Sequence, residues 1–412
     1  MLNAYSTKFT VGIVGLGLIG GSLAKRLVKQ NCTVYAYNRH TDIYSQAREA
    51  GIICVDSVKD LALKKPNVLI LCNSLASMPS VLKQLENNID QSVTTLSDVG
   101  SVKDIVRNQV KAANLGECYV GAHPMAGSEF TGWKSSYAEL LDNALWALTV
   151  DSNTKLWRVA NVLHMITNVC KNRAIVINDY IHDKSAALIS HMPHVVSTAL
   201  ANVLCDNQYR NIAIQLSAGS WRDMTRVSLT DPNRTRAMVS EDRHNVAILL
   251  RSLIKELDKA ATMLEDSAEN ADSAEKEFFA KAQPWREYKY AVRNKESSGA
   301  LSDSGALVDS GALVDSGTLV DSGTLVDSGY SGTLEPSSAL SPMKNSECDS
   351  LECDSVLNWR EKLLDSAKNG EEIIGISSNL DYENIDFSSD NEYSYNLRLK
   401  KNNIMMKFMG RI

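Results

Sequence analysis

The chain has 412 residues, with 43 Lys and Arg against 49 Asp and Glu, and 44% of its residues are hydrophobic. This length predicts two or three domains, with ample chain to bury a core. The net charge of −6 excludes a generally basic nucleic-acid binder. The acidity is concentrated in residues 298–356, which hold ten acidic residues and one lysine, so the rest of the chain is nearly neutral.

The cysteines and the apolar runs indicate the compartment. The eight cysteines are scattered without a CxxC pair, and the chain is too long for a disulfide scaffold. No apolar run approaches the roughly 18–20 residues that a transmembrane helix needs. We therefore expect reduced thiols in a cytoplasmic protein with neither a membrane nor a nucleic-acid partner.

The first 178 residues alternate apolar runs with helical patterns. Buried strands are predicted at 9–15, 32–38, 67–73, 93–98, 118–123, 144–150 and 173–178, with helices such as 20–30, 43–50, 101–113 and 154–169 between them. Strands that alternate with helices are typical of a parallel sheet covered by helices on both faces. We expect an α/β, Rossmann-type doubly wound domain over 1–178.

The strand signals stop after residue 178. From 179 to about 285, apolar residues recur every three or four positions, which predicts an all-α domain. Its apolar stripes exceed what so small a bundle can bury alone, so we expect a homodimer formed through these helices.

The remaining residues, 286–412, have a different composition. SGALSD, SGALVD, SGALVD, SGTLVD and SGTLVD repeat with a period of six and then give way to Ser-, Asp- and Glu-rich sequence. Five imperfect hexads make fewer than two turns of a β-helix, so a disordered tail is favoured. One short helix is possible at 356–368, and truncation near residue 290 is expected to leave turnover unchanged.

A glycine-rich motif follows the first strand. The segment GLGLIGG spans Gly15 to Gly21 and opens a helix, which is the context that makes GxGxxG informative. The first glycine permits a tight turn, the second admits a pyrophosphate, and the third lets helix and strand pack closely. The predicted dinucleotide-binding residues here are Gly15, Gly17, Leu18, Ile19 and Gly20.

The end of the second strand selects the cofactor. NAD-preferring sites usually place Asp or Glu there, but this strand ends Tyr37-Asn38-Arg39-His40 and no carboxylate appears before Asp42. Arg39 can pair with a 2′-phosphate, and Asn38 can hydrogen-bond to the same group. The sequence therefore predicts NADP, with NAD as the less favoured cofactor.

Four further blocks contain candidate chemistry: SDVGSVK (97–103), GAHPMAGSE (121–129), HD with SHMPH (182–194) and RDMTR (222–226). Read with the glycine loop, they resemble the prephenate/arogenate dehydrogenase family of tyrosine biosynthesis over about residues 9–265. The resemblance implies an oxidative decarboxylation. Hydride leaves the ring carbinol carbon, the hydroxyl proton leaves with it, and loss of CO2 aromatises the ring.

The resemblance also implies roles for individual residues. His123 matches the family's catalytic histidine and Ser101 the serine beside it, while Arg226, His194 and Glu129 match substrate-binding positions. A neutral imidazole can accept a hydroxyl proton near neutral pH, and an arginine can grip a carboxylate with two N–H bonds. His182 and His191 are expected to make supporting hydrogen bonds, and no metal is expected.

Alternatives remain open. Prephenate and arogenate cannot be separated, because a tryptophan that some relatives carry is replaced by Thr235, between Arg234 and Arg236. Other enzymes with this architecture oxidise β-hydroxyacids and use a lysine base, for which Lys184 is the nearby candidate. A different class is a non-catalytic NADP-binding interaction protein that recruits a partner through its acidic repeats.

Overall fold

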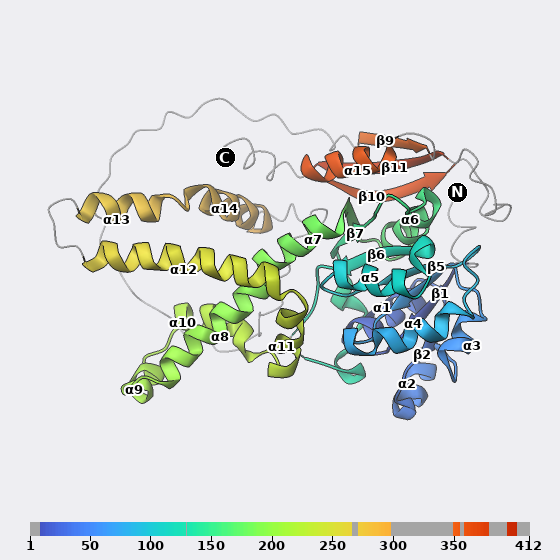
Figure 1. The fold of residues 1–412 in the computed structure, drawn as a ribbon, viewed down its shortest axis with the longest axis horizontal. Coiled ribbons are helices and arrows are strands. Elements are labelled where there is room, and N and C mark those ends of the chain that lie inside the picture. The colour runs from blue at the N-terminus through green and yellow to red at the C-terminus, as the bar shows by residue number, and fades with distance from the viewer. Residues whose placement is uncertain are drawn as a thin grey trace.

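The structure is a computed structural model that describes residues 9–128, 130–265, 271–297, 349–354, 358–378 and 394–401. A sheet-containing part and an elongated helical part lie next to each other in Figure 1. The last described elements return to the sheet-containing part, far along the chain from the residues they contact.

The described strands form one eleven-stranded sheet in the order β3-β2-β1-β4-β5-β6-β7-β8-β10-β11-β9. The strands are β1 (Thr10–Val14), β2 (Thr33–Tyr37), β3 (Ile53–Cys54), β4 (Val68–Leu71), β5 (Thr95–Asp98), β6 (Tyr119–Pro124), β7 (Leu145–Thr149), β8 (Arg173–Ile177), β9 (Asp349–Asp354), β10 (Glu371–Ser378) and β11 (Ser394–Lys401). The six from β3 to β6 are mutually parallel in the order 3-2-1-4-5-6, which is the Rossmann arrangement.

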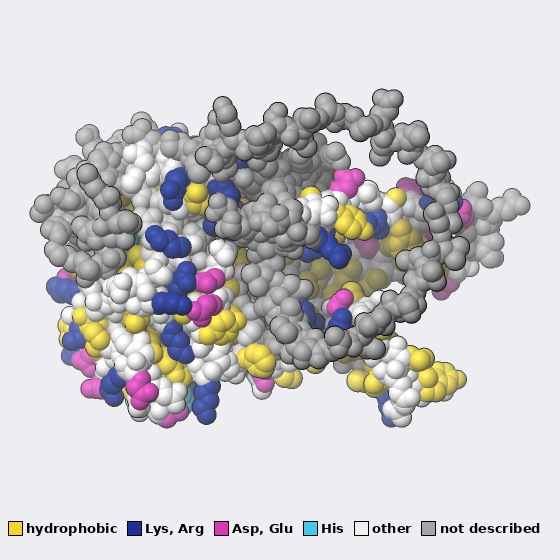
Figure 2. Space-filling view, turned by 180° about the vertical axis from the view of Figure 1, so that it is seen from behind, with side chains coloured by type: hydrophobic (Ala, Val, Ile, Leu, Met, Phe, Trp, Pro, Cys, Tyr) yellow, Lys and Arg dark blue, Asp and Glu magenta, His cyan; other side chains and the backbone are white. Residues whose placement is uncertain are grey.

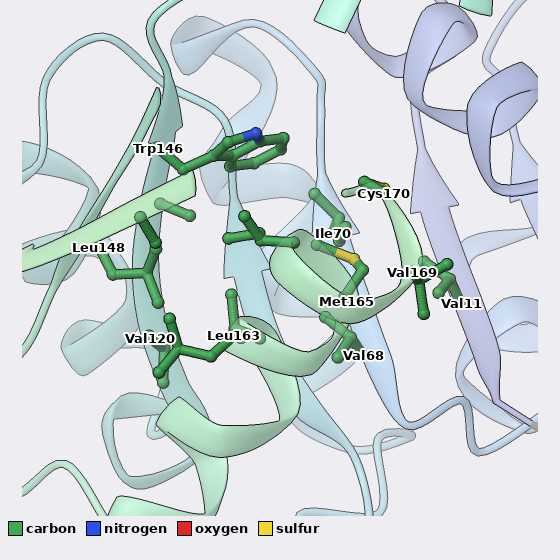
Figure 3. Packing of buried hydrophobic residues seen from close by; sticks show 14 of the residues in the cluster. Val11, Val68, Ile70, Val120, Trp146, Leu148, Leu163, Met165, Val169 and Cys170 are labelled. Atoms are coloured by element: carbon green, nitrogen blue, oxygen red, sulfur yellow. The ribbon is translucent and has the colours of Figure 1, made fainter. Parts of the chain in front are cut away.

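Helices cover both faces of the sheet and enclose two cores. One core packs against α1 (Leu18–Lys29), α2 (Tyr44–Glu49), α6 (Leu156–Leu163) and its π-helical continuation η6 (His164–Val169). The other packs against α3 (Val58–Ala62), α4 (Met78–Glu86) and α5 (Asp104–Ala112). Figure 3 shows the first core, where strand residues such as Ile70 and Trp146 meet Leu163 and Met165.

The predicted strands of the first domain are all present, and their short apolar runs are buried because both faces of the sheet are covered. The expectation of a wholly parallel sheet is wrong at β7, which runs antiparallel to β6. The described residues of the connection over 125–144 contain short 3-10 turns and no α-helix, so the chain returns to the sheet without a helical crossover.

The helical part contains a long run of helix followed by shorter elements. Its members are α7 (Asp179–Ala186), the π-helical η7 (Ala187–His191), α8 (Met192–Cys205), α9 (Arg210–Gln215), α10 (Gly219–Thr225), the 3-10 turn η8 (Arg226–Leu229), α11 (Pro232–Glu241), α12 (Arg243–Glu265), α13 (Ala271–Ala280) and α14 (Gln283–Ser297). The π-helical turn comes directly before Pro193, whose ring cannot fit a regular helix interior.

Apolar side chains of this part face outward. Leu216 and Leu229 are each 77% exposed, and Figure 2 shows yellow side chains on the arm that carries α9. The run Asp179–Cys205 is long and apolar enough to cross a membrane by length and composition: its most apolar 18-residue stretch has a mean hydropathy of 1.3, and 11% of that stretch is buried. A helix that packs against a partner subunit is also long and apolar, and it is equally exposed when one chain is considered alone.

Part of the predicted tail is folded. Helix α14 continues past residue 285, and β9, α15 (Trp359–Lys368), β10 and β11 form a unit on the edge strand β8. The expectation of a largely disordered 286–412 is therefore corrected for these stretches. The hexapeptide repeats, and the basic C-terminal end from residue 402 on, lie outside the described residues.

Several kinds of contact attach this C-terminal unit to the sheet domain. Arg173 and Glu372 form a half-buried ion pair. The Asn168 side chain donates to the Ile376 carbonyl at 2.7 Å and accepts from the Ile376 amide at 3.1 Å, in the manner of a paired strand. Trp359, Leu363, Tyr395, Leu397 and Leu399 are buried in the same core as the Rossmann strands.

Candidate active site

The glycine turn after β1 has the geometry of a phosphate-binding loop. Gly15 has φ +97°, and a Cβ there would lie 3.0 Å from the Cys72 carbonyl oxygen. A Cβ at Gly20 would lie 2.0 Å from the Gly15 carbonyl oxygen, so only glycine lets α1 pack this closely. A Cβ at Gly17 would meet nothing within 4 Å, and no side chain caps the helix. The free N-terminus of α1 therefore fits the pyrophosphate of a dinucleotide.

The residues at the end of β2 divide into supporting and exposed groups. Asn38 Oδ1 accepts the Leu16 amide at 2.9 Å, and its Nδ2 donates to the His40 carbonyl at 2.7 Å. The Asn38 amide thus holds the glycine turn, a role that the sequence did not suggest. Arg39 is exposed and contacts the His40 ring at 3.3 Å, which leaves its charge available to a ligand.

Leu18 and Ile19 open helix α1. Leu18 is buried at 7% exposure and Ile19 is half-buried. Because they occupy the first turn of the helix, what these two positions can offer a phosphate is their backbone N–H groups.

A chain of hydrogen bonds leads from His123 to a carboxylate. His123 lies on β6, and its Nδ1 is 3.0 Å from His182 Nε2 on α7. His182 Nδ1 in turn is 2.7 Å from Asp183 Oδ1. The structure therefore brings together the GAHP and HD motifs, which are 59 residues apart in the chain.

This network assigns the tautomers of both rings. The Asp183 carboxylate accepts from His182 Nδ1–H, so His182 Nε2 carries a lone pair. That lone pair accepts from His123 Nδ1–H, which leaves His123 Nε2 unprotonated. His123 thus has one ring nitrogen ready to accept a proton.

The surroundings of His123 keep the ring neutral. Burial, followed by the nearby His182, Lys103 and His191, holds the pKa of His123 well below its ordinary value. Burial opposes ionisation of Asp183, but hydrogen bonds from His182 and from the backbone amides of Asp104 and Lys103 leave its pKa below the usual range. A neutral base and an ionised carboxylate therefore coexist near neutral pH.

A buried ion pair positions the strand that carries His123. Lys103 Nζ contacts Asp98, both side chains are fully buried, and Nζ also donates to the Ala122 carbonyl at 2.9 Å. Asp98 Oδ1 accepts from the Tyr119 hydroxyl at 2.8 Å and from the Ala122 amide at 3.2 Å. Both polar groups of the residue before His123 are thus held by this pair.

Sequence reasoning missed Lys103 and Asp98 as parts of the site. Both belong to the SDVGSVK block, with Asp98 near its start and Lys103 at its end. Their partner, Ala122, lies on β6, and it is near only because β5 and β6 are neighbours in the sheet. Ser101 lies between them in the bend after β5 and is half-buried. Its placement next to the His123 imidazole stays a prediction.

The helical part joins the site through Asp183 and Asp179. Asp183 accepts the Lys103 amide at 2.7 Å and the Asp104 amide at 2.9 Å, so it caps α5 from another domain. Asp179 contacts the Arg107 guanidinium in an interdomain ion pair, with Nη2 3.2 Å from Oδ1. These contacts fix α7, and with it His182, against the sheet.

Cationic groups gather around His194. Its Nδ1 lies 2.9 Å from the Ser190 carbonyl, and burial, with smaller effects of His191, Arg234 and Arg226, lowers its pKa. His191 is fully buried and pairs with Asp242 at 2.9 Å. The predicted residues His194 and Arg226 lie on two elements that contact each other, α8 and η8. Glu129 lies outside the described residues.

No group of three His, Cys, Asp or Glu side chains with a metal-binding arrangement occurs in the described ranges. The six cysteines whose side chains the structure describes are free thiols.

Comparisons with known proteins agree with this arrangement. The family model described as the prephenate dehydrogenase nucleotide-binding domain matches residues 23–176, and that of the prephenate dehydrogenase dimerization domain matches residues 179–279. A cyclohexadienyl dehydrogenase of Zymomonas mobilis is 29% identical over 62% of this chain and 88% of its own length. A prephenate dehydrogenase of Bacillus subtilis is 27% identical over 64% of this chain and 72% of its own length.

A solved structure is similar over the same region. Prephenate dehydrogenase from Aquifex aeolicus, in complex with hydroxyphenyl propionate and NAD+, aligns with a TM-score of 0.58 at 26% identity, over 70% of this chain and 98% of that chain. The two family models together span more than half of the sequence and end before the repeats. The chain belongs to the prephenate dehydrogenase family of NAD(P)-dependent oxidoreductases.

Proposed function

We propose that this chain oxidises and decarboxylates prephenate to 4-hydroxyphenylpyruvate, with His123 as the base. The observation that carries the proposal is the His123–His182–Asp183 network at the carboxyl end of the sheet, where doubly wound folds bind ligands. A bound pyridine nucleotide would supply the hydride acceptor.

The side chains of the protein contribute to the reaction by removing one proton, that of the ring hydroxyl. His123 Nε2 accepts the proton of the ring hydroxyl as the hydride leaves, which avoids an alkoxide. The imidazolium then shares its Nδ1–H with His182, whose ring is anchored to Asp183. The carboxylate stabilises the positive charge that the imidazole acquires.

The substrate carries two carboxylates, and the helical domain offers a guanidinium and an imidazole as their partners. Arg226 and His194 are proposed to hold them, with Ser101 oriented toward the hydroxyl and Glu129 at the mouth of the site. Arogenate differs from prephenate in bearing an amino group on the side chain, and the Zymomonas mobilis relative is named for cyclohexadienyl substrates in general. Arogenate is therefore the alternative substrate.

The direct test measures absorbance at 340 nm with prephenate and arogenate, each supplied with NADP and with NAD. We expect turnover with prephenate and the faster rate with NADP. Turnover with arogenate alone would replace the substrate assignment. Absence of turnover with all four pairs would favour the non-catalytic interaction protein.

The NADP preference is argued from Arg39. Its guanidinium is exposed directly after β2, and the strand end lacks the carboxylate that would bind a ribose 2′-OH. Arg39→Asp should shift the NADP/NAD ratio of kcat/KM toward NAD by roughly 10-fold or more, since a charge-assisted contact is replaced by repulsion. Arg48→Asp makes the same charge change on the exposed side of α2 and should leave the ratio unchanged. An unchanged ratio in Arg39→Asp would contradict the preference.

We further propose a cytoplasmic homodimer. The match to a dimerization domain and the exposed apolar residues of the helices support the dimer. The free thiols support a reducing compartment.

A further inference from the structure

The segment that follows His123 is attached to the helical domain by Arg234. The sheet holds this segment as far as Met125, whose amide donates to the Leu145 carbonyl at 2.8 Å. Arg234 Nη1 then donates to the Ser128 carbonyl at 2.8 Å and to the Phe130 carbonyl at 3.3 Å. These bonds connect positions 104 and 106 residues apart in the chain.

The backbone around Arg234 is well fixed for this purpose. Helix α11 begins at Pro232, and the Asp231 side chain caps it by accepting the Asn233 and Arg234 amides at 3.0 Å each. Arg234 therefore sits in a capped first turn and reaches the loop with its side chain.

The helix of this guanidinium, α11, contacts α8, which carries His194. Arg234 and Arg226 both act electrostatically on the His194 ring. A Cβ at Gly127 would lie 3.9 Å from Arg234 Nη2, so the loop backbone approaches the guanidinium closely. Arg234 thus contacts the loop, while its helix α11 packs against α8, the helix that carries His194.

We propose that Arg234 is a positioning residue, which fixes the loop at Ser128 and Phe130 near His194 and Arg226 so that the substrate dianion binds to a preformed site. The proposal rests on the function proposed above. A planar guanidinium suits this role because one nitrogen can serve two carbonyls while another packs against the backbone, which a lysine ammonium cannot reproduce.

The test compares Arg234→Ala and Arg234→Lys with Arg236→Ala in the full chain. Arg236 is an exposed cation two residues along the same helix, so its removal makes the same charge change without touching the loop bonds. Two quantities are measured: KM and kcat for the substrate, and hydrogen–deuterium exchange of the amides at 126–132 without substrate. Dinucleotide affinity checks that the fold is intact.

Arg234→Ala should raise KM by about 10-fold, which is the expected effect of losing one charge-assisted hydrogen bond. The kcat of this variant should stay within about 3-fold of the wild-type value. It should also speed amide exchange in the loop, Arg234→Lys should recover part of both effects, and Arg236→Ala should change neither. Equal behaviour of Arg234→Ala and Arg236→Ala would overturn the proposal. A raised KM without faster exchange would also overturn it, because Arg234 would then bind substrate directly.

The exchange measurement separates this proposal from the proposed function. If the wild-type chain turned over neither prephenate nor arogenate, the function would fail. Faster loop exchange confined to Arg234→Ala would still establish the attachment, and unchanged exchange would refute it.

Discussion

At the scale of single residues, the site depends on a proton path of three side chains. Asp183 has two attachments, because its carboxylate caps α5 through two amides and also receives His182 Nδ1–H. An asparagine has a single acceptor oxygen, so it would place an NH2 group against one of these donors.

Asp183→Asn should lower kcat roughly 10- to 1000-fold, since the tautomers of His182 and His123 are no longer imposed. Removal of the negative charge also disfavours the imidazolium and lowers the pKa of His123 further. The acid limb of the kcat/KM profile should therefore move to lower pH while the plateau falls. Asp104→Asn, the same change at the exposed neighbour, should alter neither. An acid limb that stayed in place would exclude a role through the imidazoles.

At the scale of elements, the C-terminal unit is part of the nucleotide-binding domain. It pairs with β8 and adds Trp359, Leu363 and Tyr395 to the Rossmann core. Unchanged turnover after truncation near residue 290 stays a prediction, but such a cut also removes these buried side chains from the core.

Deletion of 349–412 should lower the Tm by about 5–10 °C, because exposure of this core costs a few kcal/mol. Deletion of the repeats at 300–329 alone should leave the Tm unchanged. Differential scanning calorimetry measures both. An unchanged Tm after deletion of 349–412 would mean that the unit contributes nothing to the domain.

At the scale of the whole molecule, we expect a second copy of the chain to bury the exposed apolar side chains of the helical domain. We expect light scattering to give twice the chain mass. Leu216→Glu should shift the mass toward one chain, because a buried carboxylate opposes the interface. Leu63→Glu, an exposed leucine of the sheet domain, should leave the dimer intact. A wild-type mass of one chain would contradict the dimer.

The sequence predicted those elements that depend on neighbouring residues, namely most strands of the first domain and the glycine turn. The apolar runs predicted the strands from β1 to β8 apart from the two-residue β3, and the glycine spacing predicted the turn at Gly15. The strand β11 has alternating buried residues at Tyr395, Leu397 and Leu399, but its burial depends on an edge strand more than two hundred residues away. Such long-range pairing has no local signature.

In the candidate active site, too, the motifs could be predicted from the sequence but the long-range contacts could not. The motifs predicted a catalytic role for His123 and a supporting hydrogen bond for His182, and the structure shows that one ring contacts the other. Two features could not be predicted: the hydrogen bonds of the Lys103–Asp98 pair to Ala122, and the contact of Arg234 with the loop. Each joins segments that are far apart in the chain and come together only in the complete fold.

The most direct measurement concerns His123 itself. His123→Asn removes the proton acceptor and leaves the glycine turn untouched, so single-turnover hydride transfer to NADP should fall by roughly 10²–10⁴ with dinucleotide affinity retained. Hydride transfer at a near-normal rate would show that another group takes the proton, and the assignment of the His123–His182–Asp183 network as the catalytic centre would be wrong.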